Sequence, residues 1–310
     1  MRILFAGTPQ VAVTSLDYLH EAGFEIAAVL TRPDAPLGRK RVLTPSPVAA
    51  RAEELGLPII KAAKITEETT AELAALELEA AAIVAYGGLV PEAALAVPTH
   101  GWINLHFSLL PHWRGAAPVQ HSIINGDDIT GAVTFQLETG LDTGPVFGQV
   151  TESIGELDTA GIMLERLSRS GSTLLVQTLQ ALASGQAVAV PQSGSHTYAP
   201  KITDVDAELD FTRTATEIRR RAHGTTPAPG AWVKVEDKRF KFGPLREHRE
   251  ITDLAPGEVH IEPGKQPKVY IGTATWALQP TEIQPPGKKM MNASDWARGV
   301  LTQGTEVSFA

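Results

Sequence analysis

The sequence contains no cysteine, which excludes disulfide bonds and metal sites built from thiolates. Long hydrophobic runs are missing as well, because no apolar stretch approaches the length that spans a bilayer. A secretory signal would begin with a basic segment and end at a small-residue cleavage site, whereas residues 2–6 lead directly into a predicted strand. These absences favour a reducing compartment, and we expect the protein to be cytoplasmic.

Net positive charge is also absent, since 27 Lys and Arg side chains stand against 35 Asp and Glu, a net charge of −8. The acidic excess lies in residues 1–184, with 11 basic and 20 acidic residues, whereas residues 185–310 hold 16 and 15. Within the latter, residues 211–249 carry 10 basic and 4 acidic side chains. A basic segment in an acidic protein is typical of contact with a phosphate backbone. The alternative, a solvated charged face, stays open on charge alone.

The hydrophobic pattern of the first half predicts an α/β fold. The chain has 310 residues, 43% of them hydrophobic, which is enough for two domains. Short runs rich in Ile, Val, Leu and Phe alternate with helical patterns, as in a doubly wound, Rossmann-like parallel sheet. The predicted strands are residues 2–6, 24–31, 57–62, 80–86, 101–107 and 131–138, and the predicted helices between the earlier ones are 9–22, 47–55 and 66–78.

The glycine-rich spacing G-x-G-x-x-G is missing after the first predicted strand, where Ala6-Gly7-Thr8-Pro9 stands instead. A nicotinamide dinucleotide site needs that spacing so that the backbone can approach the pyrophosphate. We therefore expect Gly7 to form a tight turn, and we do not expect a dinucleotide site.

The pattern changes in the last third of the chain. A long amphipathic helix is predicted at 158–184, and residues 185–204, which bear Gly, Ser and Pro without helical period, are interpreted as a linker. Beyond it a hairpin is predicted at 231–242, and further short strands separated by Pro and Gly favour a small β-barrel. The predicted domains are therefore residues 1–184 and the smaller 205–310.

Three polar residues near predicted strand ends suggest acyl-transfer chemistry. Asn104 and His106 lie two residues apart on a strand, so both side chains project from the same face. Asp142 follows the next apolar run and is expected at the end of a neighbouring strand. An amide donor, an imidazole base and a carboxylate form a site that can exchange an acyl group between amines. The alternative is a core histidine beside a turn asparagine; the three residues together favour the site.

The sequence resembles the folate-dependent formyltransferases along nearly its whole length. Within that family, Trp113–Pro118 and the C-terminal third resemble the members that act on methionyl initiator tRNA. Two positions depart from the family pattern beside the expected folate pocket: Phe107 replaces a glycine and His112 replaces a basic residue. The segments that carry the resemblance are Arg2–Pro9, Arg32–Asp34, Pro45–Pro47, Val84–Gly87, Asn104–Pro118, Leu141–Gly144 and Gln284–Lys289.

The resemblance implies a Rossmann-like formyltransferase domain followed by an OB-like barrel that binds tRNA. It also implies 10-formyltetrahydrofolate as the formyl donor, with no metal. Asn104 would then donate to the developing oxyanion, and His106 would act as general base or polarising group. Asp142 would either orient His106 or share its proton. The residues expected to contact folate are Ser108, Leu109, Leu110, Pro111, Tyr86 and Gly87.

Two basic clusters are expected to bind the initiator methionyl-tRNA. One is a loop tip that resembles the tRNA-contacting loop of the family. The other lies on the helix predicted at 214–222, and phosphate contacts there would be salt-sensitive and largely sequence-blind. The cluster residues are Arg39, Lys40 and Arg41 in the loop and Arg219, Arg220 and Arg221 on the helix.

We expect the protein to act as a monomer.

Two other functions stay open from the sequence. A formyltransferase acting on an amino sugar nucleotide or on glycinamide ribonucleotide would keep the same catalytic residues, but it would need neither the barrel nor the basic segment 211–249. A non-catalytic or NAD-type nucleotide-binding module is disfavoured by the missing glycine spacing and by the presence of all three polar residues.

Overall fold

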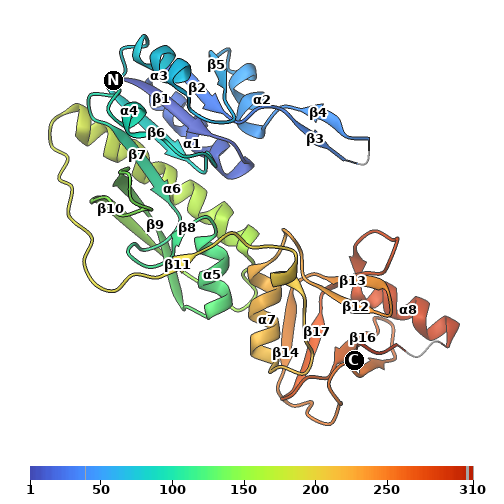
Figure 1. The fold of residues 1–310 in the computed structure, drawn as a ribbon. Helices are drawn as coiled ribbons and strands as arrows, with labels where there is room; N and C mark the ends of the chain where they lie inside the picture. Colours follow the sequence, from blue (N-terminus) through green and yellow to red (C-terminus); the bar gives the residue numbers. More distant parts are fainter. Residues whose placement is uncertain (39, 305–306, 310) are drawn as a thin grey trace. The chain divides into compact units, whose positions relative to one another are not determined.

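The structure is a computed structural model that describes residues 1–38, 40–304 and 307–309. The chain divides into two compact units (Figure 1). The first comprises residues 1–118, 129–153 and 164–200, and the second comprises 119–128, 154–163 and 201–310. Two short segments that the sequence placed in the N-terminal domain thus pack with the C-terminal unit, which sequence separation alone does not reveal.

In the described residues of the first unit, seven strands form one sheet in the order β10-β9-β7-β6-β1-β2-β5. The five strands from β5 to β7 are parallel, as the βα alternation predicts. The last two are antiparallel to their neighbours, so the strand predicted at 131–138 runs opposite to the expected direction. The strands are β1 (Arg2–Gly7), β2 (Glu25–Thr31), β5 (Ile59–Lys61), β6 (Ala80–Val84), β7 (Trp102–His106), β9 (Ile129–Gln136) and β10 (Val146–Ser153).

Gly7 lies at the end of β1 and is not part of a tight turn. A Cβ atom there would come within 2.9 Å of the Ala12 Cβ and 3.0 Å of the Val84 carbonyl oxygen. Those distances are shorter than van der Waals contact, so a side chain would push the first helix off the sheet. The glycine is required by close packing rather than by a turn, and the expectation of a turn was wrong.

Side-chain caps start two of the predicted helices. The Ser46 hydroxyl accepts from the Ala49 N–H at 3.0 Å, and the Thr66 hydroxyl accepts from the Thr69 N–H at 3.2 Å. Both bonds satisfy backbone donors that have no partner inside the helix. The helices up to residue 183 are α1 (Gln10–Glu21), α2 (Pro47–Glu54), α3 (Glu67–Ala74), α4 (Glu92–Leu95), α5 (Pro118–Asn125) and α6 (Ala160–Ala183).

Helices cover both faces of the sheet. Leu73 of α3 and Ala94 of α4 belong to one buried cluster with inward residues of β1, β2 and β6. On the opposite face, α6 is tied to the sheet by a 2.8 Å hydrogen bond between the hydroxyls of Thr134 and Thr178. A Cβ at Gly171 of α6 would lie 3.0 Å from Leu105 of β7, so Leu105 points toward α6. The doubly wound arrangement that the sequence predicts is present.

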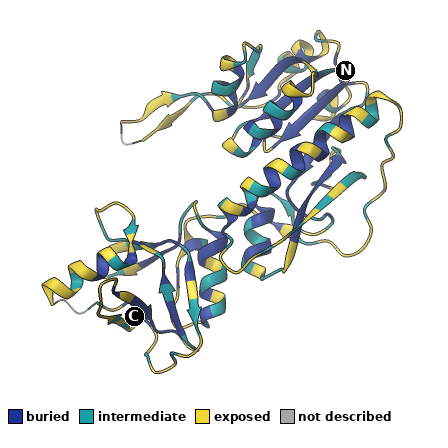
Figure 2. Cartoon of the chain, turned by 180° about the vertical axis from the view of Figure 1, so that it is seen from behind, coloured by how far each residue is buried: buried dark blue, intermediate teal, exposed yellow. Residues whose placement is uncertain are grey.

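Two segments expected to lack regular structure contain short strands. The basic loop is a hairpin of β3 (Ala35–Leu37) and β4 (Val42–Thr44), whose apolar side chains remain exposed. Figure 2 shows this hairpin as largely exposed, extending away from the buried strands of the sheet. In the expected linker, β11 (Tyr198–Ala199) pairs in parallel with β8 (Arg114–Gly115), the segment that follows β7. The linker is therefore partly built into the first unit.

The second unit contains the antiparallel strands that the sequence predicts. Among its described residues, two four-stranded sheets have the orders β12-β13-β18-β19 and β14-β17-β16-β15. A capping box of Thr214 and Glu217 starts helix α7. The elements are η1 (Val205–Ala207), α7 (Ala215–Gly224), β12 (Trp232–Val235), β13 (Lys238–Phe242), β14 (Leu245–His248), β15 (Val259–Glu262), β16 (Lys268–Ile271), β17 (Ala277–Pro280), β18 (Glu282–Gln284), β19 (Met291–Asn292) and α8 (Ala293–Gln303).

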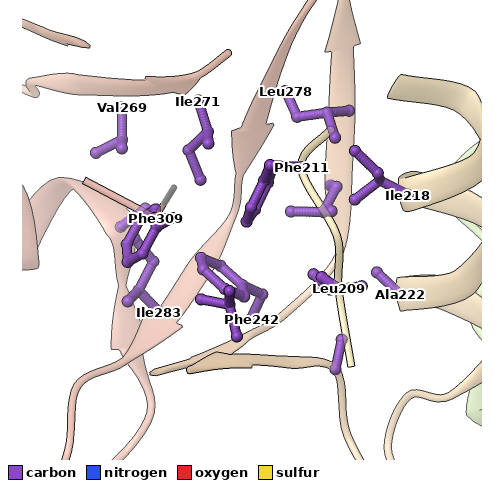
Figure 3. Packing of buried hydrophobic residues seen from close by; sticks show 14 of the residues in the cluster. Leu209, Phe211, Ile218, Ala222, Phe242, Val269, Ile271, Leu278, Ile283 and Phe309 are labelled. Atoms are coloured by element: carbon purple, nitrogen blue, oxygen red, sulfur yellow. The ribbon is translucent and has the colours of Figure 1, made fainter. Parts of the chain in front are cut away.

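Both sheets of the second unit share one apolar core with α7 and α8. Phe242 comes from one sheet, Leu278 from the other and Ile218 from α7, and all are buried together (Figure 3). The ring centroids of Phe211, Phe242 and Phe309 lie within 6.0 Å of one another. The contacts are edge-to-face and stacked, both of which stabilise aromatic clusters. This single core accounts for the barrel-like domain expected from the strand spacing.

Among the described residues of this unit, one imidazole is buried, and its Nε2 is hydrogen-bonded to the backbone. His223, at the end of α7, is 1% exposed, and its Nε2 accepts from the Leu245 N–H at 2.9 Å. Burial lowers the pKa of His223 from 6.5 to about 4, and the nearby Arg219 guanidinium acts in the same direction. The folded protein therefore holds His223 neutral well below pH 6.5.

We expect the free energy of unfolding to decrease as the pH falls from about 6.5 toward about 4. Above pH 6.5 the imidazole is neutral in both states and its contribution is fully present. As the pH falls, the unfolded chain takes up a proton first, which costs the folded state up to about 3 kcal/mol. Denaturant unfolding of wild type and His223→Gln at about pH 7.5 and about pH 4.5 measures this. The glutamine does not titrate, so an equal loss in both proteins would contradict the assignment.

Within the described residues, no helix is both long and apolar enough to cross a membrane.

Candidate active site

The strand alternation of β7 places Asn104 and His106 together. Leu105 points toward α6, so its two neighbours project from the other face of the sheet. Asn104 is half-buried, and its side-chain amide makes no hydrogen bond to any residue that the structure describes. A half-buried amide without a protein partner is available to a ligand, because desolvated polar groups need one.

His106 is oriented by a backbone carbonyl. The Nε2 of His106 lies 3.0 Å from the carbonyl oxygen of Trp113. The rings of His106 and Phe135 make a T-shaped contact, with 6.3 Å between their centroids. A carbonyl oxygen only accepts, so the neutral imidazole carries its hydrogen on Nε2. Nδ1 is then the nitrogen that can take up a proton.

Asp142 approaches His106 by a route that the sequence did not predict. Because β9 is antiparallel to β7, Gln136 at its end pairs with Ile103, away from His106. The sequence placed Asp142 after a neighbouring strand of a parallel sheet, but that strand is antiparallel to β7. The connection between β9 and β10 returns along the sheet and brings the Asp142 Oδ2 to 3.8 Å from the His106 Nδ1.

The carboxylate of Asp142 is held by backbone and not by the imidazole. Its Oδ2 accepts from the Gly115 N–H at 2.7 Å, whereas 3.8 Å to His106 exceeds a hydrogen bond. Asp142 therefore acts on His106 through charge, and Trp113 supplies the orientation. Trp113 has a φ of 62°, a left-handed backbone that is costly for a side chain of this size, whereas Asp142, at 50°, is of a residue type that tolerates this region.

Burial decides the protonation state of His106. Removal from water lowers the pKa of the His106 imidazole below 6.5, against the opposing effects of the Asp142 carboxylate and the Trp113 carbonyl. The ring is therefore neutral near pH 7 and can accept a proton at Nδ1. A proton there would be stabilised by the carboxylate 3.8 Å away.

The residues after β7 form a compact loop. The buried Ser108 hydroxyl donates to the His112 carbonyl at 2.6 Å, so the loop uses this side chain internally. Leu110 packs in a small cluster with Val133 and Phe135, beside the ring of His106. Of the residues expected to contact folate, Leu109 and Pro111 are the ones in this loop that stay half-exposed.

The ring of Tyr86 is buried in the core and is not presented to solvent. It is 2% exposed, and its hydroxyl donates to the Ala62 carbonyl at 3.1 Å. Burial raises the pKa of Tyr86 above 10, so the phenol remains neutral. The following Gly87 has a φ of 80°, which a glycine adopts without strain. The ring of Tyr86 is therefore packed in the core, and its contact with folate stays a prediction.

The basic hairpin presents two described cations. Lys40 and Arg41 are both exposed at its turn, while Arg39 lies outside the described residues. On the strands that carry these cations, Leu37, Val42 and Leu43 have exposed fractions between 58% and 68%. The hairpin therefore presents apolar side chains beside the cations.

The arginine cluster on α7 is divided by its contacts. Arg219 is 17% exposed, and its Nε donates to the buried carboxylate of Glu247 at 2.8 Å. That carboxylate also accepts from Thr216 and Trp276, so Arg219 belongs to a structural network. Arg220 and Arg221 each reach a backbone carbonyl, and Arg221 is the exposed member. Arg219 is therefore engaged by Glu247, unlike the other two arginines of the expected tRNA-binding cluster.

Several residues that shape the site were missed from the sequence. Trp113 and Gly115 act through backbone atoms, which no side-chain pattern reveals. Gln192 lies in the expected linker, yet its amide bonds to the backbone of Asp142 and Gly144. A single polar residue in a segment of Gly, Ser and Pro carries no local indication of that role. Among the described residues, no group of three or more His, Asp or Glu side chains is arranged to hold a metal ion.

Comparison with protein families assigns a class to this site. A family model described as formyl transferase matches residues 1–179, and one described as formyl transferase, C-terminal domain, matches residues 201–301. A curated methionyl-tRNA formyltransferase from Paenarthrobacter aurescens (strain TC1) is 60% identical over 302 residues, covering 97% of this chain and 98% of that protein. The chain therefore belongs to the formyl transferase family and, within it, to the methionyl-tRNA formyltransferases.

Solved structures support the fold at lower identity. An N-formyltransferase from Helicobacter canadensis, in complex with folinic acid and dTDP-3-aminofucose, superposes with a TM-score of 0.67 at 18% identity, covering 90% of this chain and 98% of that one. Methionyl-tRNA formyltransferase from Clostridium thermocellum gives a TM-score of 0.56 at 15% identity, covering 79% and 93%.

We expect His106 to titrate below pH 6.5 and to carry its neutral hydrogen on Nε2, because burial lowers its pKa and Trp113 accepts at that nitrogen. Nitrogen-15 NMR of histidine-labelled protein reports both properties. Asp142→Asn removes the charge that raises the pKa, so the titration of His106 should move to still lower pH. An upward shift in that variant, or a neutral tautomer with hydrogen on Nδ1, would contradict the geometry.

Proposed function

We propose that this protein transfers the formyl group of 10-formyltetrahydrofolate to the amino group of methionyl initiator tRNA, giving N-formylmethionyl-tRNA for translation initiation. The observation that carries the proposal is that β7 presents on one face the Asn104 amide, which makes no hydrogen bond to the described residues, and a buried, neutral His106, in a chain of this family. As part of the proposal, the enzyme acts as a cytoplasmic monomer.

The side chains present fit a formyl donor. Formyl transfer makes a bond between the amine nitrogen and the formyl carbon, and negative charge develops on the formyl oxygen before the folate nitrogen leaves. The unpaired Asn104 amide is a donor for that oxygen, a contribution that typically lowers the barrier by about 3 kcal/mol. Bound folate supplies the formyl group, and the half-exposed Leu109 and Pro111 of the loop after β7, with the backbone of Gly87, would hold it.

His106 and Asp142 handle the proton. Nδ1 of His106 accepts the proton that the attacking amine loses, since its Nε2 is engaged with Trp113. Asp142 then faces an imidazolium at 3.8 Å and stabilises it without taking the proton itself. The proton passes from His106 to the folate nitrogen as the bond between that nitrogen and the formyl carbon breaks, which returns His106 to its neutral form. The amine of an aminoacyl ester is weakly basic, so much of it is already neutral, and we expect orientation to contribute more to the rate than proton removal.

The tRNA would be held mainly by charge. We assign catalysis to residues 1–184, the connection to 185–204 and tRNA binding to 205–310 together with the basic sequence Arg39, Lys40 and Arg41. Arg220 and Arg221 are the members of the α7 cluster left to meet phosphate, because Arg219 is paired with Glu247. A small acceptor would need neither cluster, which favours tRNA over an amino sugar nucleotide.

Purified protein with labelled 10-formyl donor should formylate charged initiator tRNA in preference to charged elongator tRNA or an amino sugar nucleotide. His106→Ala and Asn104→Ala should each lower kcat by about 100-fold or more, because both act on groups that change charge in the transition state. His20→Ala, an exposed histidine of α1, is the matched control and should leave kcat unchanged. Equal turnover in all these variants would refute the site, and preference for the sugar nucleotide would refute the acceptor.

The efficiency on charged tRNA should fall steeply as salt rises from about 50 to about 200 mM, because bound phosphates release counterions. Arg39→Ala should lower kcat/KM more than Arg220→Ala, since the family resemblance assigns the basic sequence 39–41 to contact with tRNA near the aminoacyl end. Arg220→Ala should reduce the salt slope by about one counterion. Arg169→Ala, an exposed residue of α6 outside both clusters, is the control and should keep the full slope. A flat salt profile would remove the tRNA assignment.

A further inference from the structure

Residues 190–199, which we call the strap, bind the loops on both sides of the candidate site. At one end, Val190 exchanges backbone hydrogen bonds of 2.8 and 2.9 Å with Val146 at the start of β10. At the other end, the Thr197 carbonyl accepts from the Arg114 N–H at 2.9 Å, and its hydroxyl accepts from the Trp113 N–H at the same distance. The strap thus contacts the loop that orients His106 and the strand that follows the Asp142 loop.

Gln192 makes the central contacts of the strap. Its Nε2 donates to the carbonyls of Asp142 at 2.8 Å and Gly144 at 2.9 Å. Its Oε1 accepts from the Arg114 guanidinium, at 2.7 Å from Nη2 and 3.3 Å from Nε. Both hydrogens and the oxygen of the amide are used, so an amide of this length is matched to the position.

Together, these contacts surround the Asp142 carboxylate with a closed set of hydrogen bonds. Gln192 holds the backbone of Asp142, Arg114 holds Gln192, and the N–H of the next residue, Gly115, holds the Asp142 carboxylate at 2.7 Å. The same carboxylate faces the His106 Nδ1 at 3.8 Å. Asp142 lies in the loop between β9 and β10, outside the regular hydrogen bonding of both strands. Gln192 supplies two hydrogen bonds to that loop, at the Asp142 and Gly144 carbonyls.

We propose that Gln192 is a positioning residue for formyl transfer, which fixes the Asp142 loop against Arg114 and so holds the Asp142 carboxylate in place beside His106. Gln192 itself touches neither His106 nor the proposed reacting atoms. The inference rests on the proposed function, because it assigns a reason for the placement of a residue in that same site.

The first test is steady-state kinetics of Gln192→Ala with folate donor and charged initiator tRNA. A displacement of about 1 Å in a catalytic group can cost up to about 100-fold in rate, and we expect kcat to fall by about 10-fold or more. The KM values for donor and tRNA should stay within about twofold, since no substrate contact is removed. Ser195→Ala, an exposed residue of the same strap, should match wild type.

The isosteric Gln192→Glu tests the donor role separately. A carboxylate can still accept from Arg114, but it has no hydrogens for the Asp142 and Gly144 carbonyls. We expect Gln192→Glu to lose as much activity as Gln192→Ala. Because glutamate fills the same space as glutamine, that loss would not come from a cavity. Wild-type kcat in Gln192→Glu would overturn the proposal.

A double-mutant cycle separates positioning from a general structural role. If Gln192 acts through the Asp142 charge, Gln192→Ala should lower the single-turnover rate by about 10-fold in wild type but by less than about twofold in Asp142→Asn. Equal effects in both backgrounds would overturn the proposal. If His106→Ala is inactive while Gln192→Ala is normal, this inference alone fails; if His106→Ala retains full activity, the proposed function of the site fails first.

Discussion

The contact on which the candidate site depends is the one between the His106 Nε2 and the Trp113 carbonyl. Because a carbonyl only accepts, this contact fixes the tautomer, turns the ring and leaves Nδ1 toward Asp142. It requires Trp113 to hold a φ of 62°, which is unfavourable for a large side chain. The strap residue Thr197 binds the Trp113 N–H and the Arg114 N–H and thereby supports that backbone. The orientation of one imidazole thus depends on a segment more than 80 residues away in sequence.

Burial and charge are balanced differently in the two units. In the first unit, His106 is desolvated beside a carboxylate too distant to form a hydrogen bond, which keeps the ring neutral and able to accept a proton. In the second unit, the buried Glu247 is fully engaged by Arg219, Thr216 and Trp276. A satisfied buried charge of that kind holds structure together, whereas the Nδ1 of His106 makes no hydrogen bond within the described residues and stays able to accept a proton. Burial of an ionisable group therefore leaves a proton-accepting atom in one unit and a fully bonded charge in the other.

The sequence by itself determined the parallel part of the sheet, the helices between its strands and the second domain of short antiparallel strands. These follow from local periodicity, from the caps Ser46, Thr66 and Thr214, and from Pro and Gly between short strands. The alternation of β7 also placed Asn104 and His106 on one face, because side chains two apart on a strand always share a side.

Only the tertiary structure decided the rest. A strand carries no local record of its direction, so the antiparallel pairing of β9 and the return of Asp142 to His106 were not available from sequence. Backbone partners are equally invisible in a residue pattern, which is why Trp113, Gly115 and Gln192 were missed. Arg219 and Tyr86 show the converse: each has the chemistry of a binding residue, but its side chain is hydrogen-bonded within the protein. Long-range hydrogen bonds and burial, which depend on residues distant in the chain, decided the role of each.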